Sequence, residues 1–226
     1  LLAATEQEQM RAEARASIVR VLDDLGRLQD RIERFRADFE SEPPDRQAGY
    51  LLGLALRELD RLDDAETVYA SLLSQQDDDL IALLALETIY DEQNRIQEAI
   101  VVLERIAEVA PERARDSYHR LAELSLRLYD DAQALRFAQL AVELNPDDPS
   151  ARARLGDIRR QMQDLPGAVE AYRAALDLDP RAFPFYFELA ELYLSLQDLE
   201  AAVSLFATVV EESNDDVQVL RAGRRA

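Results

Sequence analysis

Histidine is the side chain most often used as a general base near neutral pH, and this sequence holds only one, His119. Glu123 follows four residues later, so the two side chains lie one turn apart on a helix. A catalytic site also needs an orienting group and a stabiliser of developing charge. No such set accompanies this pair, so we interpret it as a surface pair and expect no enzymatic activity.

Metal and cofactor chemistry lacks its usual residues. There is no cysteine, and one histidine cannot supply a zinc site of the common kinds. The run Asp77–Asp79 lacks the spaced carboxylates and the glycine of a calcium loop, and the six glycines form no phosphate-binding loop. We expect no metal and no cofactor. Aspartates recur at Asp147-Asp148 and Asp215-Asp216, which favours a helix-capping role.

The charge balance restricts the partners. Aspartate and glutamate number 46 against 26 basic residues, all of them arginine, and the formal net charge is −20. This balance opposes direct binding to nucleic acid or to an anionic membrane, and it favours basic partners. The longest apolar run, Leu80–Leu86, is far shorter than a membrane span. Hydrophobic residues make up 48% of the chain, enough for a continuous core.

The ends and the arginine bias suggest an origin. The chain opens at Leu1 without methionine and stops at Ala226 inside a helical pattern, so we expect a module of a longer protein. The exclusive use of arginine is typical of a GC-rich, bacterial genome. The compartment stays open between the cytoplasm, which is favoured, and the periplasm.

Alanine and leucine recur at one fixed step. Successive members of each series lie 34 or 35 residues apart. The series are Ala65, Ala99, Ala134, Ala168 and Ala202, and Leu52, Leu86, Leu121, Leu155 and Leu189. A period of this length indicates a stack of identical supersecondary units.

Within one period the pattern predicts two amphipathic helices. Apolar residues between Leu165 and Leu176 recur at steps of three and four, as one helix face requires. Asp164 is a plausible N-cap for this helix, Pro166 suits its first turn, and Pro180 ends it.

These residues resemble the tetratricopeptide repeat (TPR). The match comprises Leu155-Gly156, then Ala168 with Tyr172, then Pro180, and it recurs from Leu189-Ala190 to Phe206. The resemblance implies an all-α, right-handed superhelical solenoid of antiparallel helix pairs. Five repeats are expected, at residues 46–79, 80–114, 115–148, 149–182 and 183–216, and residues 217–226 would begin a further or capping helix.

Residues 1–45 admit two interpretations. Apolar residues from Ile18 to Phe39 follow a heptad pattern, which predicts one long helix and an oligomerisation seam. The repeat register also continues backwards to Ala12. Gly26 then falls at an inter-helix turn and Pro43 closes the unit, which favours a degenerate sixth repeat.

The resemblance also implies a binding surface, because the first helix of each TPR lines a concave groove. The expected lining comprises Tyr50, Leu54, Arg57, Leu84, Thr88, Asp91, His119, Glu123, Leu126, Ala153, Asp157, Arg160, Phe187, Glu191 and Leu194. The groove would be apolar near Leu54 and acidic near Glu123 and Glu191, with Phe187 as an exposed aromatic anchor. The lysine of the family's carboxylate clamp is absent.

The function expected from these features is a protein-interaction scaffold. It would dock a partner helix or peptide that carries apolar anchors and basic residues. Two alternatives stay open: a homo-oligomerisation module that uses the N-terminal heptads, and the regulatory or substrate-recruiting module of a larger enzyme.

Overall fold

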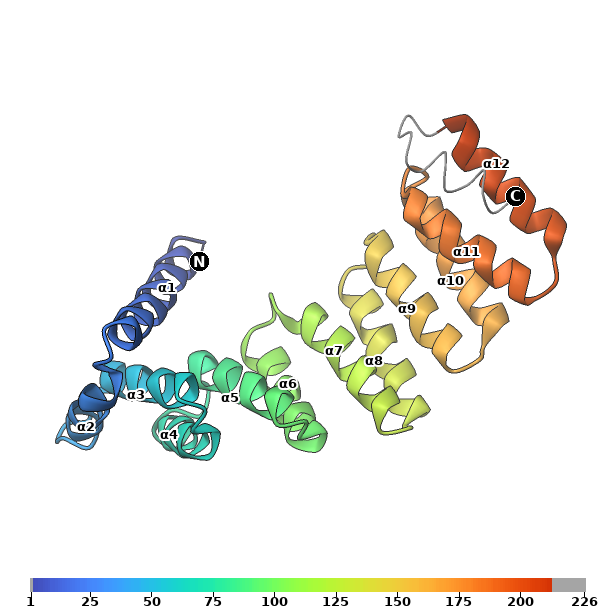
Figure 1. Ribbon diagram of the computed structural model, residues 1–226. Helices are drawn as coiled ribbons and strands as arrows, with labels where there is room; N and C mark the ends of the chain where they lie inside the picture. Colours follow the sequence, from blue (N-terminus) through green and yellow to red (C-terminus); the bar gives the residue numbers. More distant parts are fainter. Residues whose placement is uncertain (1, 213–226) are drawn as a thin grey trace. The chain divides into compact units, whose positions relative to one another are not determined.

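The computed structural model describes residues 2–212 and shows a helical repeat architecture throughout them (Figure 1). Twelve α-helices lie within this part of the chain. The helices are α1 (Leu2–Asp24), α2 (Leu28–Phe39), α3 (Arg46–Glu58), α4 (Leu62–Gln75), α5 (Leu80–Glu92), α6 (Ile96–Val109), α7 (Ala114–Arg127), α8 (Asp131–Leu144), α9 (Pro149–Gln161), α10 (Leu165–Leu178), α11 (Phe183–Ser195) and α12 (Leu199–Glu212). The predicted all-α fold of helix pairs is confirmed.

The helices group into two compact units. Leu1–Ala110 forms the N-terminal unit and Pro111–Ala226 forms the C-terminal unit. In each unit, neighbouring helices pack in sequence order, as expected when every repeat contacts only its neighbours. From α3 onward, each predicted repeat range contains one helix pair, whose members we name the first helix and the second helix. The repeat boundaries themselves stay a prediction.

Aspartates cap the first helices α3, α5 and α9, at Asp45, Asp79 and Asp148, and the last two of these sites were predicted above. The carboxylate of Asp79 accepts hydrogen bonds from the backbone N–H groups of Ile81 and Ala82, 3.0 and 3.2 Å away. Asp148 accepts one from Ser150, at 2.9 Å. These bonds satisfy donors that a helix N-terminus leaves free, so the predicted capping role is confirmed at both sites. Asp215-Asp216 lies outside the described residues.

The turn inside each helix pair holds one residue in the left-handed backbone conformation. These residues are Gly26, Asp60, Asn94, Tyr129, Gln163 and Gln197, with φ between 56° and 63°. They follow one another at the repeat spacing, and each comes shortly after the end of a first helix. A left-handed residue at this place terminates a helix and reverses the chain.

Small residues let the two helices of a pair approach closely. Ala65, Ala134, Ala168 and Ala202 are fully buried, and Ala99 is 2% exposed. A Cβ added at Gly53 would lie 2.5 Å from the Tyr69 ring, a distance no real Cβ tolerates. The repeated alanines and glycines therefore set the helix spacing, and buried aromatics fill the space beside them.

The N-terminal segment is a helix pair and not one continuous helix. The chain reverses between α1 and α2 at Gly26, whose φ is 63°. The heptad residues of α2 serve the fold, because Leu28, Ile32 and Phe39 are buried. Those of α1 are exposed, Ile18 by 45% and Val21 by 54%, and so is Leu25 in the turn that follows α1, by 63%.

Two further sequence predictions concern a membrane span and a helix after residue 216. None of the helices within residues 2–212 has both the length and the hydropathy that crossing a bilayer would demand. The helix expected from Val217 lies outside the residues that the structure describes.

Candidate partner-binding face

Ten of the thirteen residues of the expected partner-binding set are accessible on the first helices. Leu54, Arg57, Leu84, Thr88, Asp91, Glu123, Asp157, Arg160, Glu191 and Leu194 are half-buried or exposed. Tyr50, His119 and Phe187 are buried, with exposures of 5%, 6% and 2%. Of the two further lining residues, Leu126 is half-buried and Ala153 is buried.

Tyr50 serves the junction between two repeats. Its hydroxyl donates a 2.7 Å hydrogen bond to the carboxylate of Asp79, which is itself only 3% exposed. Arg46 forms an ion pair with the same carboxylate. Burial raises the pKa of Tyr50, and the bond to the Asp79 carboxylate adds to this effect. The expected role of Tyr50 as an accessible groove residue is wrong, because its hydroxyl is committed to this cluster.

His119 occupies on α7 the position that Tyr50 occupies on α3, two repeats earlier. It lies four residues after Arg115, as Tyr50 lies four residues after Arg46. Burial lowers the pKa of His119 to about 4, and the positive charge of Arg154 lowers it further. The imidazole is therefore neutral at pH 7. The interpretation of His119 as a surface residue paired with Glu123 is wrong.

Phe187 is part of the core. Its ring centroid lies 6.0 Å from that of Phe206, and it packs in a cluster that includes Leu189, Ala190 and Tyr193. The expectation of an exposed anchor fails because Phe187 points into the α11–α12 interface. Its neighbours Phe185 and Tyr186 are half-buried, as expected for aromatics that pack between helices.

A cavity of about 370 Å³ lies on the first helices of the N-terminal unit. Leu54 and Arg57 of the expected groove line it, together with Glu92 of α5. Arg57 Nε lies 3.2 Å from a Glu92 carboxylate oxygen. Helix α1 closes the cavity with Val19 and Arg20.

A second cavity, of about 310 Å³, lies within the C-terminal unit between α7 and α9. Three of its lining residues, His119, Glu123 and Asp157, belong to the expected groove. The full lining is His119, Glu123, Arg154, Asp157, Ile158 and Gln161. Each unit thus has a cavity on the face that the repeat register assigned to binding.

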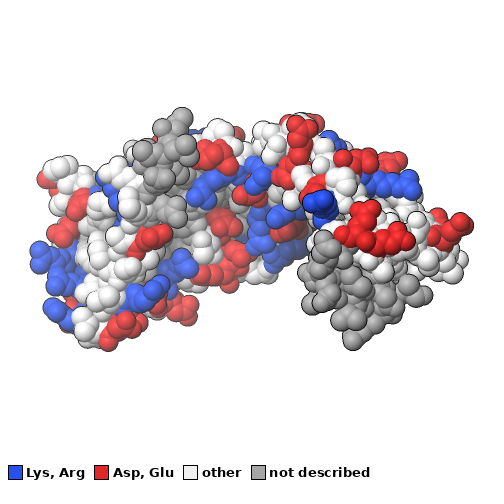
Figure 2. All heavy atoms as spheres, turned by 90° about the horizontal axis from the view of Figure 1, so that it is seen from above, with Lys and Arg blue, Asp and Glu red and all other residues white. Residues whose placement is uncertain are grey.

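The acidic side chains of this face are already paired. Asp157 accepts hydrogen bonds from the Tyr172 hydroxyl at 2.7 Å and from Arg160 at 2.9 Å. Arg160 also lies 3.3 Å from Glu188. Figure 2, a view from above, shows that arginines and carboxylates both occur on the surface facing the viewer. The expected acidic groove is therefore largely neutralised in place.

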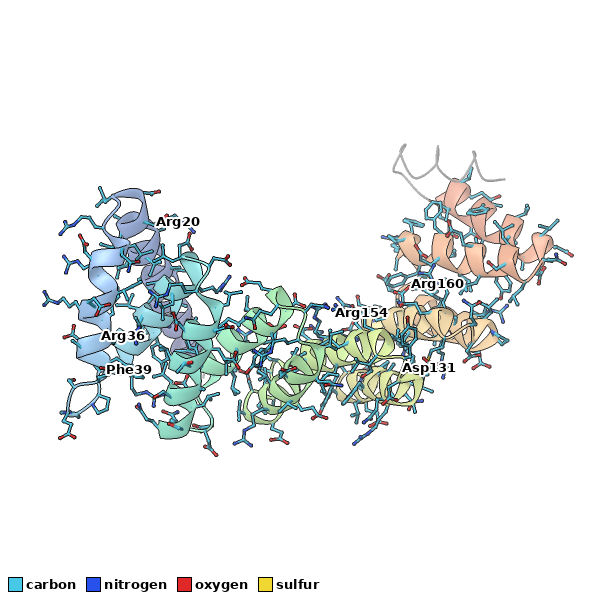
Figure 3. The ribbon with its side chains drawn as sticks, turned by 60° about the horizontal axis from the view of Figure 1, so that its bottom comes forward. Arg20, Arg36, Phe39, Asp131, Arg154 and Arg160 are labelled. Carbon is cyan, nitrogen blue, oxygen red and sulfur yellow. The ribbon has the colours of Figure 1, made fainter. Side chains whose placement is uncertain are left out.

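The sequence interpretation missed three lining residues that matter. Val19 and Arg20 line the first cavity because α1 packs against α3, which the degenerate-repeat register would have indicated. Arg154 lines the second, three residues before Asp157 and therefore on the same helix face. Figure 3 shows Arg154 and Arg160 along one side of the C-terminal unit and Asp131 of α8 on the other.

Both cavities combine aliphatic side chains with arginines and carboxylates. Within residues 2–212, no three histidine, aspartate or glutamate side chains lie close enough to hold a metal ion.

Two curated proteins align with part of the chain. RNA polymerase II-associated protein 3 of Xenopus laevis is 30% identical over 140 residues, which cover 60% of this chain and 21% of that protein. The general transcriptional corepressor ssn6 of Schizosaccharomyces pombe is 32% identical over 97 residues, 42% of this chain and 8% of that protein. The chain therefore spans only a small part of either relative's length.

Solved structures share the fold at lower identity. YrrB, described as a TPR protein with an unusual peptide-binding site, has a TM-score of 0.57 at 21% identity, covering 85% of this chain and 99% of YrrB. A tetratricopeptide repeat protein from Parabacteroides merdae also has a TM-score of 0.57, at 19% identity, covering 94% of this chain and 84% of that protein.

A family model of the tetratricopeptide repeat matches residues 17–80 and 153–217, together more than half of the chain. The first match begins at residue 17, so it covers the C-terminal part of α1 and the whole of α2. The register, the helix pairs and this match agree, and the chain belongs to the tetratricopeptide repeat family.

Proposed function

We propose that this chain is a non-enzymatic protein-interaction module that docks a helical or extended partner segment on its first helices. The TPR fold is a known protein-interaction module, and proteins built from it are generally non-enzymatic scaffolds. The observation that carries the proposal is the pair of cavities, one in each unit, lined by residues at the expected groove positions. YrrB, which shares the fold, is described as having a peptide-binding site.

The docked segment would use both kinds of chemistry present in the cavities. Half-buried Leu54 offers an apolar contact in the N-terminal unit, and the largely buried side chains of Val19 and Ile158 form part of the walls of the two cavities. Charged side chains surround these contacts and would fix the register of the segment. Each cavity is near the lower end of the range for small-molecule sites, so one or two partner side chains suit it better than a large ligand.

The test selects peptides from a random library against the intact chain and measures their affinity for four variants. Leu54→Arg and Gln161→Arg change one cavity each. Val101→Arg and Gln139→Arg place the same side chain at exposed positions on second helices. We expect at least one cavity substitution to weaken each selected peptide by about tenfold, and neither control to do so. Peptides weakened only by the controls would contradict docking on the first helices.

A second candidate function is self-association through α1, favoured by the exposed apolar residues Ile18 and Val21 on the helix and Leu25 in the turn directly after it. These residues keep the 3.5-residue spacing by which helices pair in coiled coils, so the occupant proposed is α1 of a second copy. The test is light scattering of the intact chain and of an Ile18→Glu, Val21→Glu double variant. A dimer that becomes a monomer supports the assembly role, and an intact chain that is monomeric at all concentrations rules it out.

A further inference from the structure

Helix α9 is basic although the chain as a whole is strongly acidic. It contains four arginines, namely Arg152, Arg154, Arg159 and Arg160, and one acidic residue, Asp157. The net charge of the whole chain is −20. This local reversal occurs on a first helix, and Arg154 of this set lines the cavity where partner docking is proposed above.

Three of these arginines have partners within the fold. Arg152 donates from Nε and Nη2 to the backbone oxygen of Pro146, at 3.1 and 2.8 Å. Arg159 donates to the backbone oxygen of Gly167, at 2.9 Å. Arg160 lies between Asp157 and Glu188, as described above. These three side chains are held in place by hydrogen bonds, and Arg159 and Arg160 also form ion pairs with carboxylates.

Arg154 is the exception. Its side chain is exposed and lines the cavity between α7 and α9. Among residues 2–212, no carboxylate lies within ion-pair distance of its guanidinium. Its charge acts on the cavity, because it contributes to the lowered pKa of His119 in the same wall. Arg154 therefore offers an uncompensated cation to whatever enters.

The two carboxylates that line the same cavity pair with other side chains and not with Arg154. Glu123 lies 3.3 Å from Arg120, and Asp157 is bonded to Tyr172 and Arg160. Each negative charge in the wall is thus matched by an arginine other than Arg154. The charge left for a ligand to neutralise is positive.

We propose that the α7–α9 cavity binds an aspartate or glutamate side chain of an acidic partner segment, through Arg154. The inference rests on the docking function proposed above and gives its partner chemistry in the C-terminal unit. The carboxylate would pair with the guanidinium, whose planar fork matches it. Its aliphatic stem would lie on Ile158, which is buried under the cavity floor, and the Gln161 amide would donate a further hydrogen bond.

A carboxylate fits this cavity better than a phosphate group. Glu123 and Asp157 remain in the wall, so a dianion would meet stronger repulsion than a singly charged group. The carboxylate of an internal aspartate or glutamate fits this cavity better than the C-terminal carboxylate of a partner, because the donors proposed for it are only the Arg154 guanidinium and the Gln161 amide. The partner preference is opposite to that expected from the net charge, since global charge does not describe the local field.

The test titrates the intact, isotope-labelled chain with small amide probes and follows the Arg154 Nε–H and the His119 ring by NMR. The probes are N-acetyl-glutamate amide, its neutral isostere N-acetyl-glutamine amide, N-acetyl-arginine amide and N-acetyl-alanine with a free carboxylate. We expect saturable shifts at both reporters with the glutamate probe, and about tenfold weaker binding of the glutamine probe. The glutamate binding should weaken as salt is added.

Arg154→Gln should abolish the response to the glutamate probe. The matched control is Arg136→Gln on α8, another exposed arginine, and it should leave the response unchanged. Equal binding of glutamate and glutamine probes, stronger binding of the arginine probe, or an unchanged response in Arg154→Gln would each overturn the proposal. Stronger binding of the alanine probe than of the glutamate probe would indicate that the cavity prefers a C-terminal carboxylate. That result would also overturn the proposal.

These outcomes are separable from failure of the docking function. The library selection tests whether any peptide uses this face, whatever its charge. Peptides that dock there without an Arg154 response would reject the acidic partner and keep the docking function. The absence of any docked peptide, beside a saturable Arg154 response, would reject the docking function instead.

Discussion

Arg115 Nη1 lies 2.9 Å from a carboxylate oxygen of Asp148, a residue thirty-three positions further along the chain. Arg46 pairs with Asp79 across the same separation. In both cases an arginine from the start of one first helix meets the aspartate that caps the next first helix. The aspartate thus joins helix initiation to the stacking of successive repeats.

Asp79→Ala should destabilise the chain more than Asp148→Ala. Asp79 is 3% exposed and makes two cap bonds, a bond with Tyr50 and an ion pair with Arg46. Losing it leaves buried donors without an acceptor, so we expect a loss of about 3 kcal/mol in the free energy of unfolding. Asp148 is 15% exposed and makes one cap bond and an ion pair with the more exposed Arg115, and a loss of about 1 kcal/mol is expected. Urea denaturation checks both values, and equal losses would contradict the difference in burial.

His119→Gln should change how stability depends on pH. The folded-state pKa of His119 is lowered from 6.5 to about 4, by burial first and by Arg154 second. The unfolded chain therefore binds a proton that the folded chain does not, and stability is lost as pH falls from about 6.5 to about 4. His119 accounts for a loss of about 3 kcal/mol over this window.

The measurement compares urea denaturation of the two proteins from pH 8 to pH 4. Carboxylates titrate in both, so the difference between the two curves isolates the histidine. Parallel curves would show that His119 keeps an ordinary pKa in the folded chain. An Arg154→Gln variant should raise the pKa of His119, which an NMR titration of the ring detects directly.

Tyr129→Gly should stabilise the chain by about 0.5–1 kcal/mol. Tyr129 has a φ of 60° and is 93% exposed, so its side chain disfavours its backbone conformation and gains little from packing. The reverse change, Gly26→Ala, supplies the control. Gly26 has a φ of 63° with no atom near its missing Cβ, and the alanine should cost about 1 kcal/mol through backbone strain alone. Thermal unfolding measures both, and a destabilised Tyr129→Gly would point to contacts made by the ring.

Phe187→Ala should lower stability by about 3–5 kcal/mol, because it opens a cavity in the α11–α12 core. Leu194→Ala, at a site that is 39% exposed on the same helix, should change it by less than about 1 kcal/mol. Calorimetric unfolding compares the two. A stable Phe187→Ala variant with weakened peptide affinity would restore the anchor role that its burial argues against.

The regular part of the sequence predicted the regular part of the fold. Ala65, Ala99, Ala134, Ala168 and Ala202 indicated helix pairs, and all five lie buried at the helix contacts. Asp79 and Asp148 were predicted as caps because capping depends on residues two or three positions away. Such local requirements can be read from spacing alone.

Accessibility on the first helices could not be predicted in the same way. Phe187, His119 and Tyr50 share the register of accessible residues, yet each is buried by a neighbouring helix that a single-helix pattern does not represent. The sequence analysis also did not predict the left-handed conformation of Tyr129 and Gln163, because neither tyrosine nor glutamine favours a positive φ.

The sequence by itself determined the repeat, the pairing of the helices and the helix face on which we propose that a partner docks. These follow from periodicity, which is a property of the chain. Only the tertiary structure decided which charges on that face remain available. Arg154 and Arg160 are six residues apart and carry the same charge. Glu188 lies close enough to Arg160 to pair with it, whereas Arg154 lines the cavity.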